Sequence, residues 1–306
     1  VDEYIITDPK SLGSKSSIVS SRLISKNSYP GGSLAVANSI SEFTNVGILI
    51  PKNNHDYYLI NFLNNLNKKI KKHIFKVNNW FTPIKRRYLN KFQFQKIFEV
   101  NEISDSLWNS NKVINLITKL KLIFKRYDLV IITDFGHGLF ESDKLLRYIN
   151  NSSIYKSINV QTNSMNLGYN FFNKYDNYNY LSIDEREFRL CLRDEKTDIR
   201  PLLKKAIRKK LIKPPFSITL GSKGSIYVST KKNIIFCPVF FDKTTDTVGA
   251  GDSYLALTSL LVKSGLDDEL IPFLGNVYAG LQSQYLANSN QINKDQLIRI
   301  TKSILS

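Results

Sequence analysis

The feature that most constrains the fold is a repeated switch between two hydrophobic patterns along the middle and end of the chain. Short runs of β-branched and other apolar residues alternate with longer stretches whose apolar residues recur three and four positions apart. Such alternation is typical of βαβ units built around a mostly parallel sheet. The sequence therefore predicts a doubly wound α/β fold with helices flanking the sheet.

The predicted elements cover most of the chain after residue 30. Strands are expected at Val46–Ile50, Leu129–Thr133, Ile158–Gln161, Phe216–Leu220, Ser225–Val228 and Ile234–Val239. Helices are expected at Ser33–Phe43, His55–Asn67, Ser106–Arg126, Glu141–Asn150, Asp198–Leu211, Asp252–Lys263, Asp267–Leu286 and Lys294–Ile304.

Two stretches, residues 4–30 and 77–102, do not fit this rhythm. Both are rich in Ser, Asn, Lys and aromatic residues, with patchy alternation of apolar and polar positions. We expect them to supply the strands of a small β-sheet lid. No repeat or Pro-rich linker marks a domain border, so residues 1–306 are expected to form one domain with an inserted lid.

The amino-acid composition indicates the cellular compartment in which the protein is expected. A chain of 306 residues with 42% hydrophobic content can bury a large core without disulfides. Cys191 and Cys237 are its two cysteines, which predicts no disulfide framework and a reducing cytoplasm. No apolar run approaches the roughly 18 residues of a membrane span. Because the chain starts at Val1 and its one methionine is Met165, we expect an N-terminal part to be missing.

The formal net charge of +17 raises the question of a nucleic-acid partner. The lysines are spread along the whole chain among Asn and Ile, without an arginine-rich stripe that carries aromatic residues. Biased residue usage explains the charge at least as well, so nucleic-acid binding ranks third among the functions considered. The charge would still attract ATP and a phosphorylated substrate.

The most informative motif is the run DTVGAGD at residues 246–252, which leads directly into an apolar helix. Gly249, Ala250 and Gly251 allow the backbone to approach a ligand, and their N–H groups lie at the positive end of that helix. Asp252, in the first turn, could accept the proton of a hydroxyl that attacks a γ-phosphorus. The alternative reading is a tight turn with an N-terminal cap.

The run resembles the Asp-Thr-x-Gly-Ala-Gly-Asp signature of ribokinase-like (PfkB) carbohydrate kinases, and every defined position matches. Other landmarks follow in the family's order. Gly31 and Gly32 resemble the segment that lets the backbone approach the substrate. Asp2 resembles an aspartate that follows the first strand and accepts hydrogen bonds from substrate hydroxyls. The resemblance implies that this first strand of the central sheet is missing.

Two further segments resemble the heptose-phosphate kinases within this family. The strand that ends TDFGHG places Asp134 where open α/β sheets bind ligands, and His137 replaces the family's lysine. The run TPIKRRY at residues 82–88 resembles a basic segment whose Lys85 and Arg87 would bind a substrate phosphate. An ordinary basic cluster that guards a strand edge competes with this interpretation.

The resemblance also implies ATP and Mg²⁺ as cofactors. Asp184 and Glu187 resemble the Asn-x-x-Glu segment that holds Mg²⁺ through water, although two acids at a helix start are also ordinary capping residues. Nucleotide-binding positions would be Thr219, Gly221, Gly224, Thr247 and Asn276. For the first three, a hairpin turn is the alternative.

Taken together, these residues predict an enzyme that phosphorylates a hydroxyl of a sugar or sugar phosphate. Ala35 stands where the family has a sugar-binding Asn, and a polar run beginning at Gln161 replaces its Asp-Pro-Lys. The rival hypothesis, motivated by Ala35, Asp184 and His137, is a catalytically idle binding protein or structural partner of a fused nucleotidyltransferase. A fused or associated nucleotidyltransferase and a homodimer formed through the lid are the partners that the resemblance implies.

Overall fold

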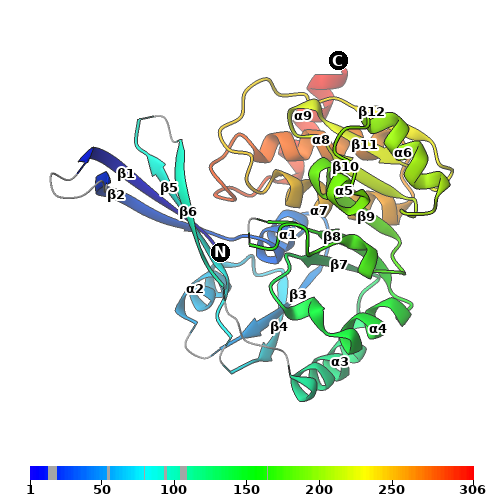
Figure 1. Ribbon diagram of the computed structural model, residues 1–306, viewed down its shortest axis with the longest axis horizontal. Helices are drawn as coiled ribbons and strands as arrows, with labels where there is room; N and C mark the ends of the chain where they lie inside the picture. The colour runs from blue at the N-terminus through cyan, green and yellow to red at the C-terminus, as the bar shows by residue number, and fades with distance from the viewer. Residues whose placement is uncertain (13–18, 54–55, 79, 93–94, 104–108, 164) are drawn as a thin grey trace.

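The computed structural model describes residues 1–12, 19–53, 56–78, 80–92, 95–103, 109–163 and 165–306. In these ranges the strands form three sheets of six, four and two strands. Figure 1 shows the four-stranded sheet extending to one side of a body in which helices surround the six-stranded sheet. The α/β class predicted from the sequence is confirmed.

The six-stranded sheet runs in the order β12-β11-β10-β9-β8-β7. Its strands are β7 (Leu129–Asp134), β8 (Tyr155–Val160), β9 (Tyr180–Asp184), β10 (Phe216–Thr219), β11 (Ser225–Val228) and β12 (Ile234–Cys237). Neighbours from β7 to β10 are parallel, whereas β11 and β12 pair antiparallel. The sequence analysis did not predict β9, because four of its five residues are buried and it lacks the alternation of a half-exposed strand.

Helices cover both faces of this sheet. Tyr180 and Leu181, adjacent in β9, are fully buried in two different apolar clusters on opposite faces. The helices that meet the Leu181 side are α3 (Ser110–Phe124), α4 (Asp143–Asn151), α5 (Glu185–Leu192) and α6 (Ile199–Arg208). The Tyr180 side meets α1 (Ser33–Ile40), α7 (Ala250–Ser264) and α8 (Leu270–Gln282). In the described ranges no helix is long and apolar enough to cross a bilayer.

The remaining helices are peripheral. Helix α2 (Tyr57–Asn65) buries Leu59 and Leu63 against the cluster on the Tyr180 side. Helix α9 (Lys294–Leu305) packs Leu297 against a third cluster that contains Val277 of α8. The predicted helix Ser106–Arg126 begins at Ser110, and residues 104–108 lie outside the described ranges.

Strands β3 (Val46–Lys52) and β4 (Ile70–Lys76) pair in parallel as a separate two-stranded sheet. The sequence analysis expected Val46–Ile50 in the main sheet, but β3 has no ladder with β7 in the described part of the chain. Strands β3 and β7 therefore share no main-chain hydrogen bonds in the described ranges.

The four-stranded sheet has the order β2-β1-β5-β6. Its strands lie mainly in residues 4–30 and 77–102, the two stretches that departed from the alternation of strand and helix patterns. Its strands are β1 (Asp2–Leu12), β2 (Val19–Tyr29), β5 (Ile84–Asn90) and β6 (Lys96–Glu102). Asp2, which the resemblance placed after a strand of the central sheet, instead opens β1 of this sheet and pairs in register with Lys85. Two residues expected at the substrate thus lie side by side on neighbouring strands.

Candidate active site

The signature run forms the turn into α7, which begins at Ala250, two residues before the predicted start. Gly249 precedes it in the left-handed conformation, with φ of 86°, and a Cβ there would lie 2.3 Å from Asn288 Oδ1. Both observations require glycine at this position. The sequence thus fixes how the chain enters the helix.

The first turn of α7 leaves amide groups available. The Ala250 N–H donates to the Thr247 carbonyl at 3.2 Å, so it is used within the turn. Gly251 and Asp252 have no backbone acceptor for their N–H groups in the described ranges. A Cβ at Gly251 would meet only open space. Free amides at the start of a 15-residue helix, with room beside them, provide the conditions for binding a phosphate.

Asp252 lies one residue beyond these glycines, and its carboxylate has one hydrogen-bond partner among the described side chains. Gln161 Nε2 donates to Asp252 Oδ1 at 3.1 Å. Removal from bulk water raises the pKa of Asp252 to about 7; the negative charge of Asp2 adds to this rise and the positive charge of Lys85 opposes it. A carboxylate with a pKa near neutrality is suited to accept a proton at physiological pH.

Asp252 lies in the wall of a cavity of ≈ 960 Å³. That cavity brings together residues that the sequence analysis assigned to catalysis and to substrate binding, although they come from widely separated segments. They are Asp2, Gly31, Gly32, Lys85, Arg87, Asp134, Gly249, Gly251 and Asp252. Predicted residues absent from this lining are Thr219, Gly221, Gly224, Thr247, Ala250, Asn276, Asp184 and Glu187.

The two basic residues of β5 have different surroundings. Arg87 is nearly buried, in close contact with the Asp2 carboxylate, and its Nε lies 3.0 Å from Glu99 Oε2. The Lys85 side chain has no ion pair in the described part of the chain, lines the cavity, and is near enough to lower the pKa of Asp252. Of these two residues, Lys85 is therefore the one whose charge is available to a ligand, whereas Arg87 holds Asp2 in place.

The two neighbouring glycines bring the backbone close to these groups. A Cβ at Gly31 would lie 2.2 Å from Asp2 Oδ2. Gly32 has φ of 54°, and a Cβ there would lie 2.9 Å from the Phe135 ring. Any larger residue would displace Asp2 or the loop after β7, so the Gly-Gly pair is required for the cavity's shape.

Comparison with known proteins indicates a carbohydrate kinase. Residues 173–294 match the family model described as pfkB family carbohydrate kinase, and this range contains the signature turn and Asp252. This part of the chain is similar to the pfkB family carbohydrate kinases. No curated protein matches it.

Solved structures share the fold of this kinase. Phosphofructokinase-2 from Escherichia coli, in complex with substrates and products, aligns with a TM-score of 0.78 and 15% identity, covering 100% of this chain and 96% of the other. Ribokinase from Thermotoga maritima aligns with a TM-score of 0.73 and 17% identity, covering 98% of this chain and 96% of the other. At such identities the similarity shows the ribokinase-like fold.

Asp134 in this kinase is buried at the end of β7, with 1% of its surface exposed. Its carboxylate accepts hydrogen bonds from the Tyr175 hydroxyl at 2.9 Å and from the Gly136 N–H at 2.9 Å. Lys174 Nζ lies 2.6 Å away. These partners fix the loop that follows β7, so the structure shows how Asp134 supports the cavity wall; a hydrogen bond to substrate stays a prediction.

His137 lies in the same loop and lines the cavity. Burial lowers the pKa of His137 to about 4, and the positive charge of Lys85 adds to this effect, so the imidazole is neutral at pH 7. Its Nε2 is buried without a hydrogen-bond partner in the described ranges. A buried nitrogen of this kind gains from a ligand that supplies the missing hydrogen bond.

The carboxylates expected near Mg²⁺ form a capping box at the start of α5. Asp184 Oδ1 accepts from the Glu187 N–H at 2.7 Å, and Glu187 Oε2 accepts from the Asp184 N–H at 2.8 Å. Glu187 Oε1 accepts from the Thr162 N–H at 3.0 Å. Burial, with the negative charges of Asp184 and Asp252 as smaller contributions, raises the pKa of Glu187 to about 8.

These contacts leave room for a water-mediated role. The described residues contain no cluster of three or more metal-ligating side chains. Mg²⁺ at kinase sites keeps several waters and takes most of its protein ligation from one or two carboxylates, with substrate phosphates completing the shell. Glu187 retains lone pairs beyond its two backbone bonds and lies near Asp252, so the donor set fits Mg²⁺ held through water.

Two of the predicted nucleotide-binding residues, Gly224 and Asn276, contact the end of β12. Gly224 has φ of 97°, and a Cβ there would lie 2.0 Å from the Cys237 carbonyl oxygen. Asn276 Nδ2 donates to the Cys237 and Pro238 carbonyls at 2.9 and 2.8 Å. Gly221 faces open space with φ of 59°. Gly224 and Asn276 thus hold the backbone of this region, while Thr219, at the end of β10, and exposed Thr247 stay predicted nucleotide contacts.

Sequence reasoning missed the direct contact between Gln161 and Asp252. It noted Gln161 only as a departure from a related pattern, yet Gln161 follows β8 directly and therefore lies at the carboxyl edge of the sheet. In open α/β sheets that edge is where ligands bind. Its position at the end of the predicted strand Ile158–Gln161 was the available signal.

Proposed function

We propose that this kinase transfers the γ-phosphoryl group of ATP directly to a hydroxyl of a sugar or sugar phosphate, with Asp252 as the general base. The observation that carries the proposal is the environment of Asp252. Its pKa is raised to about 7, it has one described side-chain partner, and it follows the free amide of Gly251 within the main cavity. A base and an anion site are adjacent in one helical turn.

The chemistry follows from these positions. The oxygen of the substrate hydroxyl attacks the γ-phosphorus while the hydroxyl proton passes to Asp252. The bond between the γ-phosphorus and the oxygen that bridges it to the β-phosphate breaks on the opposite side, in line with the attack. The Gly251 N–H, at the positive end of α7, stabilises the charge that develops on the transferring group. Mg²⁺, when bound, neutralises charge on the ATP phosphates, with Glu187 and Asp184 as its expected partners through water. No covalent enzyme intermediate is required.

Lys85 and His137 support an acceptor that already carries an anionic group. Lys85 presents a positive charge to the cavity without a described ion pair, and the neutral His137 has an unpaired Nε2 in the same cavity. Together they can bind a phosphate with one charge and one hydrogen bond. We therefore favour a sugar phosphate, including the heptose-phosphate type, over an uncharged sugar. Asp2, held by Arg87, is the proposed acceptor for substrate hydroxyls.

The experiment is ADP release from ATP and Mg²⁺ across matched pairs of acceptors, each sugar tested with and without its phosphate. The panel contains hexoses, heptoses, pentoses and polyols, and Asp252→Asn serves as the inactive control. Turnover with phosphorylated members that disappears in the control supports the proposal. Turnover in the control that equals wild type would remove Asp252 from the mechanism.

A catalytically idle binding protein is the second candidate. The observation that favours it is that two charged residues expected to bind substrate already have partners within the protein. Arg87 pairs with Asp2, and Asp134 pairs with Lys174. Asp252, whose carboxylate has one described side-chain partner, argues against it, because an idle protein gains nothing from a half-buried acid with a raised pKa. ATP binding without turnover on any acceptor would favour this candidate.

We also propose that one further β-strand fits between β3 and β7, as the resemblance implied. The support is the cavity, which is lined by consecutive residues 46–51 of β3 and 129–134 of β7. A cavity on the face of a strand touches every second residue, so this one lies along the two strand edges. Slower amide exchange in β3 and β7 when upstream residues of the natural gene product are included would support it; unchanged exchange would not.

The macromolecular partners predicted from the sequence stay predictions, and the structure offers support for the homodimer. Homodimer formation through the four-stranded sheet is favoured by apolar side chains on β6, where Ile97, Phe98 and Val100 are 49%, 53% and 43% exposed. Sedimentation of the wild type against Phe98→Ser tests it. A nucleotidyltransferase partner, a cytoplasmic location and the low rank of nucleic-acid binding stay as predicted from the sequence.

A further inference from the structure

The first residue of the signature run, Asp246, is buried at 7% exposure and has an unusual number of partners. Its Oδ2 accepts from the Tyr4 hydroxyl in a short contact and from the Ala287 N–H at 3.0 Å. Its Oδ1 accepts from the Val248 N–H at 3.2 Å and forms an ion pair with Lys96 Nζ at 3.1 Å. Four donors therefore satisfy one carboxylate.

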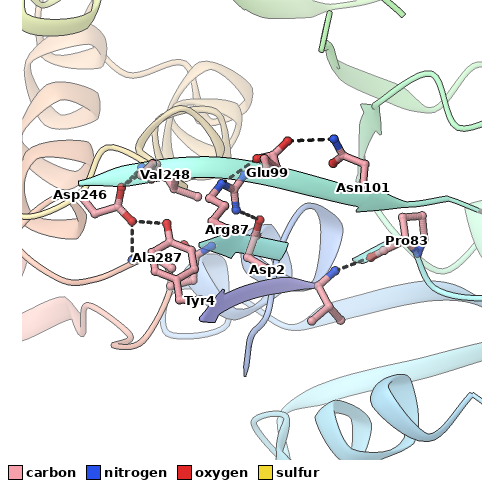
Figure 2. Close-up of polar contacts among 12 residues, drawn as sticks. Asp2, Tyr4, Pro83, Arg87, Glu99, Asn101, Asp246, Val248 and Ala287 are labelled. Carbon is pink, nitrogen blue, oxygen red and sulfur yellow. Dashed lines mark hydrogen bonds and ion pairs between the residues drawn. The ribbon is translucent and has the colours of Figure 1, made fainter. Parts of the chain in front are cut away.

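These donors come from segments that are far apart in sequence. Figure 2 shows Asp246 between Tyr4, on a strand of the four-stranded sheet, and the main chain at Val248 and Ala287. Tyr4 belongs to β1 and Lys96 to β6, on opposite sides of β5. Asp246 thus joins two strands of the sheet to the turn that precedes α7.

The joined groups lie next to the reacting groups. Tyr4 is two residues from Asp2 on the same face of β1, and its partner in register is Arg87, which holds Asp2. On the other side, the Asp246–Val248 hydrogen bond closes an Asx-type turn immediately before Gly249. Any shift of the sheet at Asp246 therefore moves Asp2 relative to the free amides of α7.

The geometry points to Asp246, with Tyr4 and Lys96, as a positioning cluster that locks the four-stranded sheet onto the anion-binding turn. Substrate-side residues on the sheet and phosphate-side amides on α7 are then brought into register by one buried carboxylate. Only the expected effect on kcat rests on the proposed phosphotransfer. The coupling of sheet to turn is a property of the protein without ligand.

Lys96 provides the cleanest test because the same sheet holds a matched control. Lys96 pairs with Asp246 and is 41% exposed; Lys91 pairs with Asp8 at 2.8 Å and is 34% exposed. Both Lys96→Met and Lys91→Met remove one lysine–aspartate pair from the sheet, but only the first breaks a link to α7. Lys96→Arg is the conservative rescue, and Tyr4→Phe tests the second link without removing a charge.

The first readout is amide hydrogen exchange of residues 246–252 in the ligand-free 306-residue chain. Lys96→Met should accelerate exchange there by about fivefold relative to wild type, because the turn loses its hold on the sheet. Lys91→Met should leave it unchanged, and Lys96→Arg should restore it. Equal exchange in Lys96→Met and Lys91→Met, with Tyr4→Phe also unchanged, overturns the inference whether or not the protein has kinase activity.

The second readout is kinetic and uses the acceptor that turns over in the panel above. Lys96→Met should lower kcat about tenfold, the value of one charge-assisted contact, while the KM for ATP stays within about twofold. A role in stability alone would lower the melting temperature of both lysine variants and leave kcat unaltered at temperatures where they are folded. That pattern would also overturn the positioning role.

Discussion

The turn at residues 246–252 and the loop at the end of β7 each place an aspartate in the wall of one cavity. The sequence analysis assigned both aspartates to the site by comparable reasoning. The structure separates them. Asp252 has one described side-chain partner, Gln161, whereas Asp134 is bound by Tyr175, Lys174 and the Gly136 amide.

The difference shows how the number of hydrogen-bond and ion-pair partners of a carboxylate distinguishes a catalytic role from a structural one. A carboxylate whose lone pairs are occupied by neighbours is committed to holding those neighbours, because releasing it would leave them buried and unpaired. A carboxylate with a free oxygen beside an anion site can exchange a proton with a ligand. The predictions below test whether Asp252 and Asp134 divide these roles.

The largest effect is expected for Asp252→Asn. Losing the proton acceptor should lower kcat by at least about 100-fold, while calorimetry should show nearly unchanged ATP affinity. Asp242→Asn, at an exposed aspartate shortly before the signature run, is the matched control and should behave as wild type. A kcat for Asp252→Asn close to that control would assign the base elsewhere.

Asp134→Asn should act on stability instead. Replacing an oxygen by an NH₂ group breaks the pairing with Lys174 and sets donor against donor, so the free energy of unfolding should fall by about 3 kcal/mol in urea titrations. The exposed neighbour Asp176→Asn should change it little. If Asp134→Asn kept wild-type stability and lost activity, Asp134 would be a ligand-binding group and the comparison would fail.

The raised pKa of the half-buried Asp252 should also be visible in the free energy of unfolding. Its pKa of about 7 in the folded protein exceeds the ordinary 3.8, so wild type is most stable below pH 4 with respect to this group and loses that contribution as pH rises through 7. The stability of Asp252→Asn relative to wild type should therefore increase by about 2 kcal/mol between pH 5 and pH 8. A constant difference across that range would show that the carboxylate is not perturbed.

The smallest effect is expected at Gln161. Its amide donates to the ionised Asp252, which favours the charged form, so Gln161→Leu should raise the pKa of Asp252. The ascending limb of kcat/KM against pH should move upward by about half a pH unit, with the maximal rate largely kept. A shift to lower pH would contradict the assigned hydrogen bond.

Much of the fold was predictable because hydrophobic periodicity reports burial. Strands such as β7 and β11 and helices such as α7 and α9 appeared near their predicted positions. Strand β9 was missed because burial on both faces removes alternation. Strand β4 was missed because the three lysines and one histidine among the seven residues Ile70–Lys76 interrupt its apolar pattern. The separation of β3 and β4 from the main sheet depends on long-range pairing that periodicity does not encode.

The site was predictable only where one local motif carries the chemistry. The run around Gly249 and Asp252 predicts by itself a turn, the start of a helix and an acidic residue in its first turn. Which charges remain free was not readable, because the pairs Arg87–Asp2 and Lys174–Asp134 join residues 85 and 40 positions apart. The cluster at Asp246 was hidden for the same reason, since Tyr4 lies 242 residues away.

The most direct test of the central claim is the pH dependence of kcat/KM for the wild type between pH 5 and 9, measured with the preferred acceptor at saturating ATP and Mg²⁺. A general base whose pKa is about 7 predicts an ascending limb with its midpoint near pH 7. That limb should be absent from the residual activity of Asp252→Asn. A flat wild-type profile, or the same limb in Asp252→Asn, would contradict the account.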